Sequence, residues 1–157
     1  MSGSAGASVT LREVSVGNLS AVLGLSVAPE QQPYVATNAK SIAEAHFYAE
    51  AWLRAIYAED APVGFLMLHD ENLRPEPRQS DYYFLWRLMI AHQFQGNGFG
   101  RQALDVLVSH VRSRPHAHTL LTSCLPGPAS PELFYVKCGF QHTGKVEGGE
   151  VELSLRL

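Results

Sequence analysis

The sequence predicts a single α/β domain built on a mixed, mostly antiparallel sheet that is flanked by helices. Three observations lead to this class. Strand-like segments pair as a hairpin in the first half of the chain, and a strand–turn–helix–strand unit follows in the second half. A chain of 157 residues, of which 46% are hydrophobic, is large enough for one core. We therefore assign residues 9–157 to one domain and residues 1–8, which are small and polar, to a flexible N-terminal tail.

The first half of the chain is expected to carry short helices beside an antiparallel hairpin. In order, we expect a strand over Val9–Val14, a helix over Asn18–Leu25, a proline-containing loop over Val27–Asn38, a helix from Ser41 to about Glu50, and strands over Ala51–Ala58 and Val63–Leu68. Ser41 and Glu44 have the spacing of a capping box. The segment Glu59–Pro62 would join the two strands as a hairpin whose connection is longer than two residues.

The second half alternates strands and helices. In order, we expect a polar loop over Glu71–Ser80, a long strand over Asp81–Ile90, a helix over Arg101–Arg112, a strand over His118–Cys124, a helix from Ser130–Pro131 to a C-cap at Gly139, and strands over Gln141–Lys145 and Val151–Leu157 around Gly148–Gly149. Leu104, Leu107, Val108 and Val111 give the long helix one apolar stripe.

The segment Gln95–Gly100, between the long strand and its helix, predicts a phosphate-binding turn. Glycine adopts positive φ and lets a ligand approach the backbone closely. The first amides of a helix have no partner inside it, and the helix dipole favours an anion there. The segment lacks the Lys-Ser/Thr of a P-loop, and its alternate glycines differ from the dinucleotide fingerprint.

The order Gln-x-x-Gly-x-Gly after an aliphatic strand resembles the pyrophosphate-binding motif of the GNAT acyltransferases, which bind acetyl-CoA. A second segment, Leu133–Phe140, resembles the other signature of that family, a helix that ends in Phe/Leu-Tyr-x-Lys-x-Gly-Phe. The resemblance extends over about Val9–Leu157. It implies a GNAT-like fold and direct transfer of an acetyl group from acetyl-CoA to an amine, without a metal.

The same resemblance assigns a cofactor site. Amides of the glycine turn would surround the pyrophosphate, and backbone groups at the end of the long strand would face the pantetheine arm. A bulge in that strand would free these groups from the sheet, and the sequence leaves the presence of such a bulge open. Ser130 would stand in for the usual Asn, and Lys137 is either a phosphate contact or an ordinary surface lysine. The expected cofactor-binding residues are Leu88, Met89, Ile90, Gln95, Gly96, Asn97, Gly98, Phe99, Gly100, Arg101, Ser130 and Lys137.

By the family motif, Tyr135 is the expected catalytic residue. A phenol can protonate the departing thiolate, although its ring could instead pack and its hydroxyl only orient the cofactor. Some family members carry a carboxylate near the end of the long strand, where this chain has Trp86 and Arg87. The general base is therefore open, with Glu150, Asp81, His92 and an ordered water as candidates.

The acceptor is expected to be a small-molecule amine. The segments Gln32–Ala45, Trp86–Ile90 and Gly149–Val151 together resemble a bacterial spermine/spermidine acetyltransferase subgroup. A polyamine needs carboxylates and aromatic faces. The expected substrate-binding residues are Glu30, Tyr34, Tyr82 and Trp86, with Glu44, Glu50 and Tyr48 as further candidates, in a negative pocket between the Pro29–Ser41 segment and the long strand. Taken singly, each acid is more often a solvated surface charge.

Two other functional classes fit the sequence: a protein or peptide N-acetyltransferase, and a CoA-binding module without turnover. The net charge of −3, with no cluster of basic residues, argues against a nucleic-acid partner. No run approaches the roughly 20 apolar residues that span a bilayer, so no membrane partner is expected. Without an export signal we expect a cytoplasmic protein with reduced cysteines and no metal site, either monomeric or a homodimer.

Overall fold

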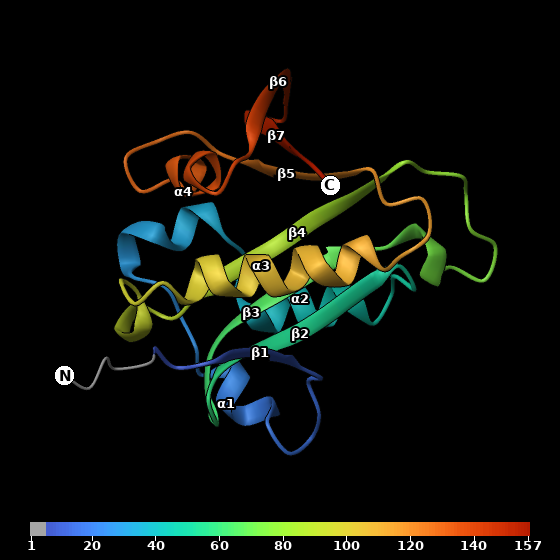
Figure 1. The fold of residues 1–157 in the computed structure, drawn as a ribbon. Helices are drawn as coiled ribbons and strands as arrows, with labels where there is room; N and C mark the ends of the chain where they lie inside the picture. Colours follow the sequence, from blue (N-terminus) through green and yellow to red (C-terminus); the bar gives the residue numbers. More distant parts are fainter. Residues whose placement is uncertain (1–5) are drawn as a thin grey trace.

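A seven-stranded sheet in the order β1-β2-β3-β4-β5-β7-β6 forms the centre of the computed structural model, which describes residues 6–157 (Figure 1). The strands are β1 (Val9–Arg12), β2 (Ala51–Ala58), β3 (Ala61–His69), β4 (Tyr82–Ile90), β5 (Thr119–Cys124), β6 (Gln141–Glu147) and β7 (Glu150–Arg156). The helices are α1 (Leu19–Leu23), α2 (Asn38–Ala45), α3 (Phe99–Arg112) and α4 (Glu132–Lys137), with 3-10 turns η1 (Pro29–Tyr34), η2 (Glu71–Leu73) and η3 (His92–Phe94). Residues 1–5 of the expected tail lie outside the described residues.

The strand pairings confirm the predicted fold class. Neighbouring strands are antiparallel except for β4 and β5, which pair in parallel. A parallel pair needs a crossover connection, and α3 supplies it. None of the helices within residues 6–157 is long and apolar enough to cross a membrane.

The parallel pair β4–β5 is short, and this opens the sheet. The two strands pair only from Tyr82 opposite Thr119 to Leu85 opposite Thr122. Beyond that last pair, β4 continues to Ile90 while β5 diverges from it towards α4 (Figure 1). The second half of β4 therefore has β3 on one side and an open edge on the other.

A β-bulge lies where the two strands separate. Met67 on β3 faces Arg87, but the next residue, Leu68, faces Leu85, so Trp86 is the extra residue. A bulge shifts the alternation of side chains. Leu85 packs in the core on one face of the sheet. The two consecutive residues Trp86 and Arg87 both lie on the other face, where Arg87 pairs with Glu44 of α2.

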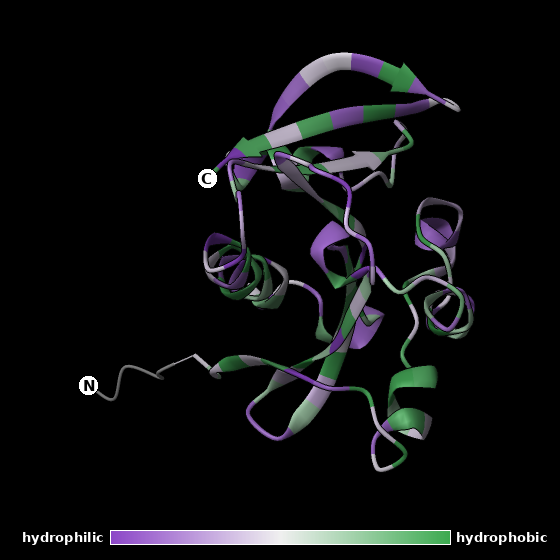
Figure 2. Cartoon of the chain, turned by 90° about the vertical axis from the view of Figure 1, so that its right-hand side faces the viewer, coloured by the Kyte–Doolittle hydropathy of each residue, from purple (hydrophilic) through white to green (hydrophobic). Residues whose placement is uncertain are grey.

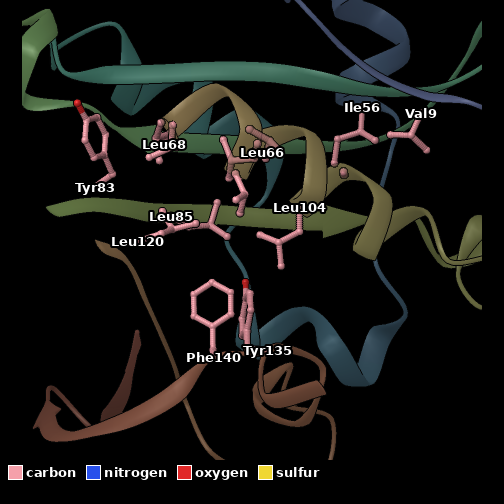
Figure 3. Close-up of a cluster of buried hydrophobic side chains, with 14 of the residues drawn as sticks. Val9, Ile56, Leu66, Leu68, Tyr83, Leu85, Leu104, Leu120, Tyr135 and Phe140 are labelled. Carbon is pink, nitrogen blue, oxygen red and sulfur yellow. The ribbon is translucent and has the colours of Figure 1, made fainter. Parts of the chain in front are cut away.

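Each face of the sheet has its own apolar core. On one face the buried stripe of α3, which includes Leu104, Leu107 and Val111, packs against β3, β4 and β5. Tyr135 and Phe140 join this core from below β4 (Figure 3). On the opposite face, α1 and α2 cover a second core that includes Val22, Phe65 and Met67. Figure 2 shows α3 and the apolar α1 on opposite sides of the strands.

Helix α2 begins earlier than the sequence suggested, and the predicted capping box is wrong. Thr37 is the N-cap, because its hydroxyl accepts a hydrogen bond from the Lys40 amide at 3.2 Å. Asn38 is buried and donates to the carbonyl of Val22 at 2.9 Å, which fixes the start of the helix against α1. Ser41 is buried inside the helix, and the helix ends at Ala45.

The hairpin between β2 and β3 also differs from the expectation. Ala58 pairs with Ala61, so the connection has only two residues, Glu59 and Asp60, with Glu59 at φ 53°. Pro62 fits within β3 because a bulge follows it: Tyr57 faces Pro62, while Ile56 faces Gly64. At the other hairpin, Gly148 and Gly149 form the predicted turn with φ of 58° and 80°.

Gly64 should be indispensable to the packing of β3 against β4. A Cβ at this position would overlap the carbonyl oxygen of Met89 and lie 2.9 Å from Cδ1 of Ile90. We expect Gly64→Ala to lower the free energy of unfolding by about 1–3 kcal/mol, as overpacking does. Urea denaturation followed by circular dichroism measures the change. Gly17→Ala, whose Cβ would meet only Ser15 Oγ at 3.6 Å, is the control, and an equal effect of the two variants would contradict this account.

Candidate active site

A cleft of about 820 Å³ opens where β4 and β5 diverge. Its walls come from η1, the second half of β4, the glycine turn with the start of α3, the loop after β5, and α4. The cleft brings together most of the residues that the sequence nominated: Tyr34, Trp86, Leu88, Met89, Ile90, Gln95, Gly96, Gly98, Phe99, Gly100, Arg101, Ser130, Tyr135 and Lys137. Asn97, Glu30 and Tyr82 do not line it.

The glycine turn presents a row of unbonded backbone amides. Gly96 and Gly98 have φ of 82° and 78°, a region that favours glycine. Helix α3 starts directly afterwards, and its first internal bond runs from the amide of Gln102 to the carbonyl of Gly98 at 3.1 Å. Within the described chain, the amides of residues 96–101 have no intramolecular acceptor. Such a row at a helix N-terminus can bind an anion.

The side chains of the turn hold it in shape. Gln95 Nε2 donates to the carbonyl of Ile90 at 2.9 Å and to Gln31 Oε1 at 2.8 Å, and Gln31 Nε2 donates back to Gln95 Oε1 at 3.1 Å. Asn97 Nδ2 donates to the carbonyl of Phe94 at 3.0 Å. The side chain of Gln95 thus joins the turn to η1 and to the end of β4, and the side-chain amide of Asn97 bonds back to the start of the turn.

The second half of β4 exposes backbone groups to the cleft. The amide of Ala91 donates to the carbonyl of Val63 at 2.9 Å, which sets the alternation of bonded pairs along β3 and β4. In an antiparallel ladder every second residue turns its backbone groups away from the partner strand. Leu88 and Ile90 are those residues here, and the β5 ladder has already ended. Their amides and the Leu88 carbonyl therefore face the cleft.

Tyr135 lies on α4 at the floor of the cleft, with its hydroxyl pointing towards β4 (Figure 3). Phe134 and Phe140 hold its ring edge-on, with centroids 5.3 and 5.4 Å away. Burial raises the pKa of the Tyr135 phenol well above its usual range, and a hydrogen bond with Thr122 offsets only part of this shift. The hydroxyl is thus held in its protonated form and can act as a hydrogen-bond donor.

The cleft is lined by more cations than carboxylates. Arg101 and Lys137 lie at the α3–α4 end, where Arg101 donates to the Lys137 carbonyl at 3.3 Å. Neither forms an ion pair with any of residues 6–157. At the η1 end lie Lys40 and Arg87. Glu150 is the one carboxylate among the described lining residues.

The other acids nominated from the sequence lie elsewhere. Glu30 is exposed outside the cleft. Glu44 pairs with Arg87 at 3.3 Å and with Lys40 at 3.9 Å, and Glu50 is buried against Arg74 at 2.8 Å. The expected acidic pocket beside Pro29–Ser41 is therefore absent from the described residues. Of the candidate bases, Asp81 and His92 are exposed residues outside the cleft lining.

Three lining contacts were not anticipated. The buried Thr122 donates its hydroxyl to the Leu85 carbonyl at 3.0 Å, and Gln31 forms the amide pair with Gln95. Tyr34 packs so closely on Gly127, which has φ 152°, that a Cβ there would overlap its hydroxyl. The sequence could have indicated Thr122, because a threonine in an otherwise apolar strand stands out. The contacts of Gln31 with Gln95 and of Tyr34 with Gly127 could not be predicted, because they join residues far apart in sequence.

Within residues 6–157, no group of three His, Cys, Asp or Glu side chains could hold a metal ion. Cys124 and Cys138 are free thiols, and burial raises the pKa of each. The described part of the cleft offers backbone amides, hydroxyls, four cationic side chains and the carboxylate of Glu150 as its binding groups.

Comparison with known proteins gives a consistent result. Residues 13–140 match the model of the acetyltransferase (GNAT) family. The spermine/spermidine N(1)-acetyltransferase of Bacillus subtilis (strain 168) is 25% identical over 143 residues, which span 89% of this chain and 92% of that protein. An acetyltransferase from Thermus thermophilus superposes with a TM-score of 0.71 at 19% identity, covering 97% of this chain and 99% of that structure. The PaiA N-acetyltransferase from Thermoplasma acidophilum, solved in complex with coenzyme A, gives 0.66 at 12% identity, covering 96% and 99%.

The raised pKa of Tyr135 can be measured. We expect the ultraviolet titration of the native protein and that of Tyr135→Phe to coincide through pH 10, the usual pKa of tyrosine, because the buried phenol keeps its proton. In denaturant the variant should show one ionising phenol fewer. A group whose pKa is raised on folding contributes stability below its unfolded pKa and loses it as the pH rises further. Native stability should therefore fall above about pH 10, and more steeply than in Tyr135→Phe. Tyrosinate from Tyr135 in the folded protein near pH 10 would contradict this.

Proposed function

The chain belongs to the acetyltransferase (GNAT) family, and within it we propose that this enzyme transfers the acetyl group of acetyl-CoA directly to a primary amine of a small polyamine. The observation that carries the proposal is the arrangement of one cleft: a row of free amides at one end, Glu150 as its carboxylate, and the protonated hydroxyl of Tyr135 on its floor.

Acetyl-CoA would bind by its phosphates and its pantetheine arm. The amides of residues 96–101 would receive the pyrophosphate at the positive end of the α3 dipole. Arg101 and Lys137 would add two cations beside it. The free backbone groups of Leu88 and Ile90 would bind the amides of the arm as an added strand binds a sheet edge. The thioester would then lie between β4 and α4.

The chemical step requires one bond to form and one to break. The amine nitrogen attacks the thioester carbon, and the C–N bond forms as the C–S bond breaks. The nitrogen becomes acidic as it gains positive charge, and Glu150, directly or through water, would take its proton. The departing sulfur would receive a hydrogen bond or a proton from Tyr135. The proton taken by Glu150 replaces, through solvent, the proton that Tyr135 gives to the sulfur. Because the amine enters in its ammonium form and loses one proton to solvent before it attacks, the products are the acetamide, free CoA as its thiol and that one proton.

Two observations favour a small cationic acceptor. The relative from Bacillus subtilis is named for spermine and spermidine, and it matches 89% of this chain. Glu150 lines the same cleft as Trp86, so a carboxylate and an aromatic face, the two groups that bind an ammonium, occur together. A peptide substrate would need an open groove, whereas the contact between Tyr34 and Gly127 joins η1 to the loop after β5.

An acceptor screen tests the reaction. With acetyl-CoA and a panel of spermine, spermidine, monoamines, aminoglycosides and peptides, we expect thiol release to be fastest with the polyamines.

Tyr135→Phe should lower kcat by roughly 10²-fold or more, with little change in the KM for acetyl-CoA, because general acid catalysis is worth about that much. Tyr83→Phe, which removes another buried hydroxyl that bonds the Pro115 carbonyl at 2.6 Å, is the control and should keep its kcat. A decrease in kcat of less than threefold in Tyr135→Phe would show that the Tyr135 hydroxyl is not the general acid.

The amide row has a separate binding test. Gly98→Val should weaken acetyl-CoA binding at least tenfold in calorimetry, because a side chain at this positive φ disturbs the turn and obstructs the amides. Gly144→Val is the matched control, since Gly144 has φ 89° with open space around it and lies on β6. Both variants should lose similar stability, and only Gly98→Val should lose affinity. Equal affinity in the two folded variants would show that acetyl-CoA binds elsewhere.

A further inference from the structure

A second pocket of about 350 Å³ adjoins the cleft on the sheet between β4 and β6. Its lining is Tyr82, Phe84, Leu121, Ser123, Lys145, Glu147, Glu150 and Glu152. Ser123 and Glu150 line both this pocket and the cleft, so the two spaces adjoin at these residues. We call this pocket the side trough.

The side trough lies on the face of the sheet opposite α3. Tyr83 and Leu85 pack with α3, so Tyr82 and Phe84, which alternate with them along β4, face the other way. The same alternation places Trp86 on that face, where it packs in the second core. Three aromatic rings therefore follow one another along β4, from the trough to the cleft.

Carboxylates form the facing wall. Glu150 and Glu152 alternate with the core residues Val151 and Leu153 on β7, and Glu147 pairs with Glu150 across the hairpin. Glu152 keeps one oxygen unbonded, because Thr143 donates to the other at 3.0 Å. Glu147 contacts Lys145 at 3.3 Å, but both side chains are more than half exposed, and such a pair binds weakly. Three carboxylates against one lysine leave the lining at −2.

We propose that the side trough binds the distal ammonium groups of a linear polyamine while its reacting amine lies in the cleft beside Glu150. This inference rests on the proposed function and names the residues that would select its acceptor, Glu147 and Glu152 with the rings of Tyr82 and Phe84. Cations bind to aromatic faces and to paired carboxylates, and a chain of amines joined by methylenes offers both an apolar stem and repeated charge. Glu147 and Glu152 do not line the cleft, so they select the substrate without touching the reacting atoms.

Steady-state kinetics of Glu147→Gln/Glu152→Gln test the proposal. We expect the KM for spermidine to rise roughly fivefold to tenfold, whereas kcat, the KM for acetyl-CoA and the KM for a linear monoamine of similar length stay within twofold. Glu30→Gln is the matched control, because it removes the same charge from an exposed position outside both pockets. Added salt should weaken spermidine binding by the wild type more than by the double variant.

Calorimetry of spermidine binding to the CoA-loaded protein separates this proposal from the reaction itself. If the double variant acetylates amines with an unchanged KM for spermidine, the side trough does not bind the distal ammonium groups, and the acetyltransferase proposal stays intact. An equal rise for the monoamine would also overturn it. If the wild type acetylates no amine, the proposed acceptor is wrong, and spermidine binding that the double variant loses would still support the side trough.

Discussion

The active-site cleft depends on one structural constraint, the early end of the ladder between β4 and β5. Leu85 and Thr122 form its last pair, and the Thr122 hydroxyl bonds the Leu85 carbonyl at 3.0 Å. The bulge at Trp86 follows at once. From there the edge of β4 is left to bind something other than a strand, and α4 can carry Tyr135 into the gap. If the ladder continued for two more residues towards Ile90, β5 would pair with this edge of β4 and the cleft would close.

Side-chain contacts between distant segments also maintain the shape of the cleft. The amide pair between Gln31 and Gln95 holds the glycine turn to η1, and Gln95 also occupies the Ile90 carbonyl. Tyr34 packs on Gly127 across the cleft. These contacts join segments that lie far apart in sequence. The amides of residues 96–101 can therefore stay unbonded without loss of order, because the side chains around them already fix the turn.

The sequence predicted what local chemistry determines. The stripe on α3, the turn at Gly148–Gly149 and the positive φ of Gly96 and Gly98 each follow from residues that are close in the chain. What depends on pairing across the fold was missed or left open: the bulge at Trp86, and the position of the carboxylates. Thr37 and Ser41 can both cap a helix, and only the bond from Asn38 to Val22 decides between them. Likewise the connection was expected to extend over Glu59–Pro62, and only the pairing with β2, with its bulge after Pro62, places Pro62 within β3.

The distribution of charge separates the two ends of the site. Arg101 and Lys137 lie with α3 and α4, whereas the carboxylates of β6 and β7 border the opposite face of the sheet. A polyanionic cofactor and a polycationic acceptor would thus approach the same gap from opposite sides and meet only at their reacting ends. Such an arrangement suits direct transfer, because both ligands can be held together without a covalent enzyme intermediate and without their charges competing for one surface. Glu30 and Glu44 are not placed to bind the acceptor amine. Glu44 pairs with Lys40 and Arg87, and Glu30 lies outside the cleft, so both are apart from the carboxylates of β6 and β7.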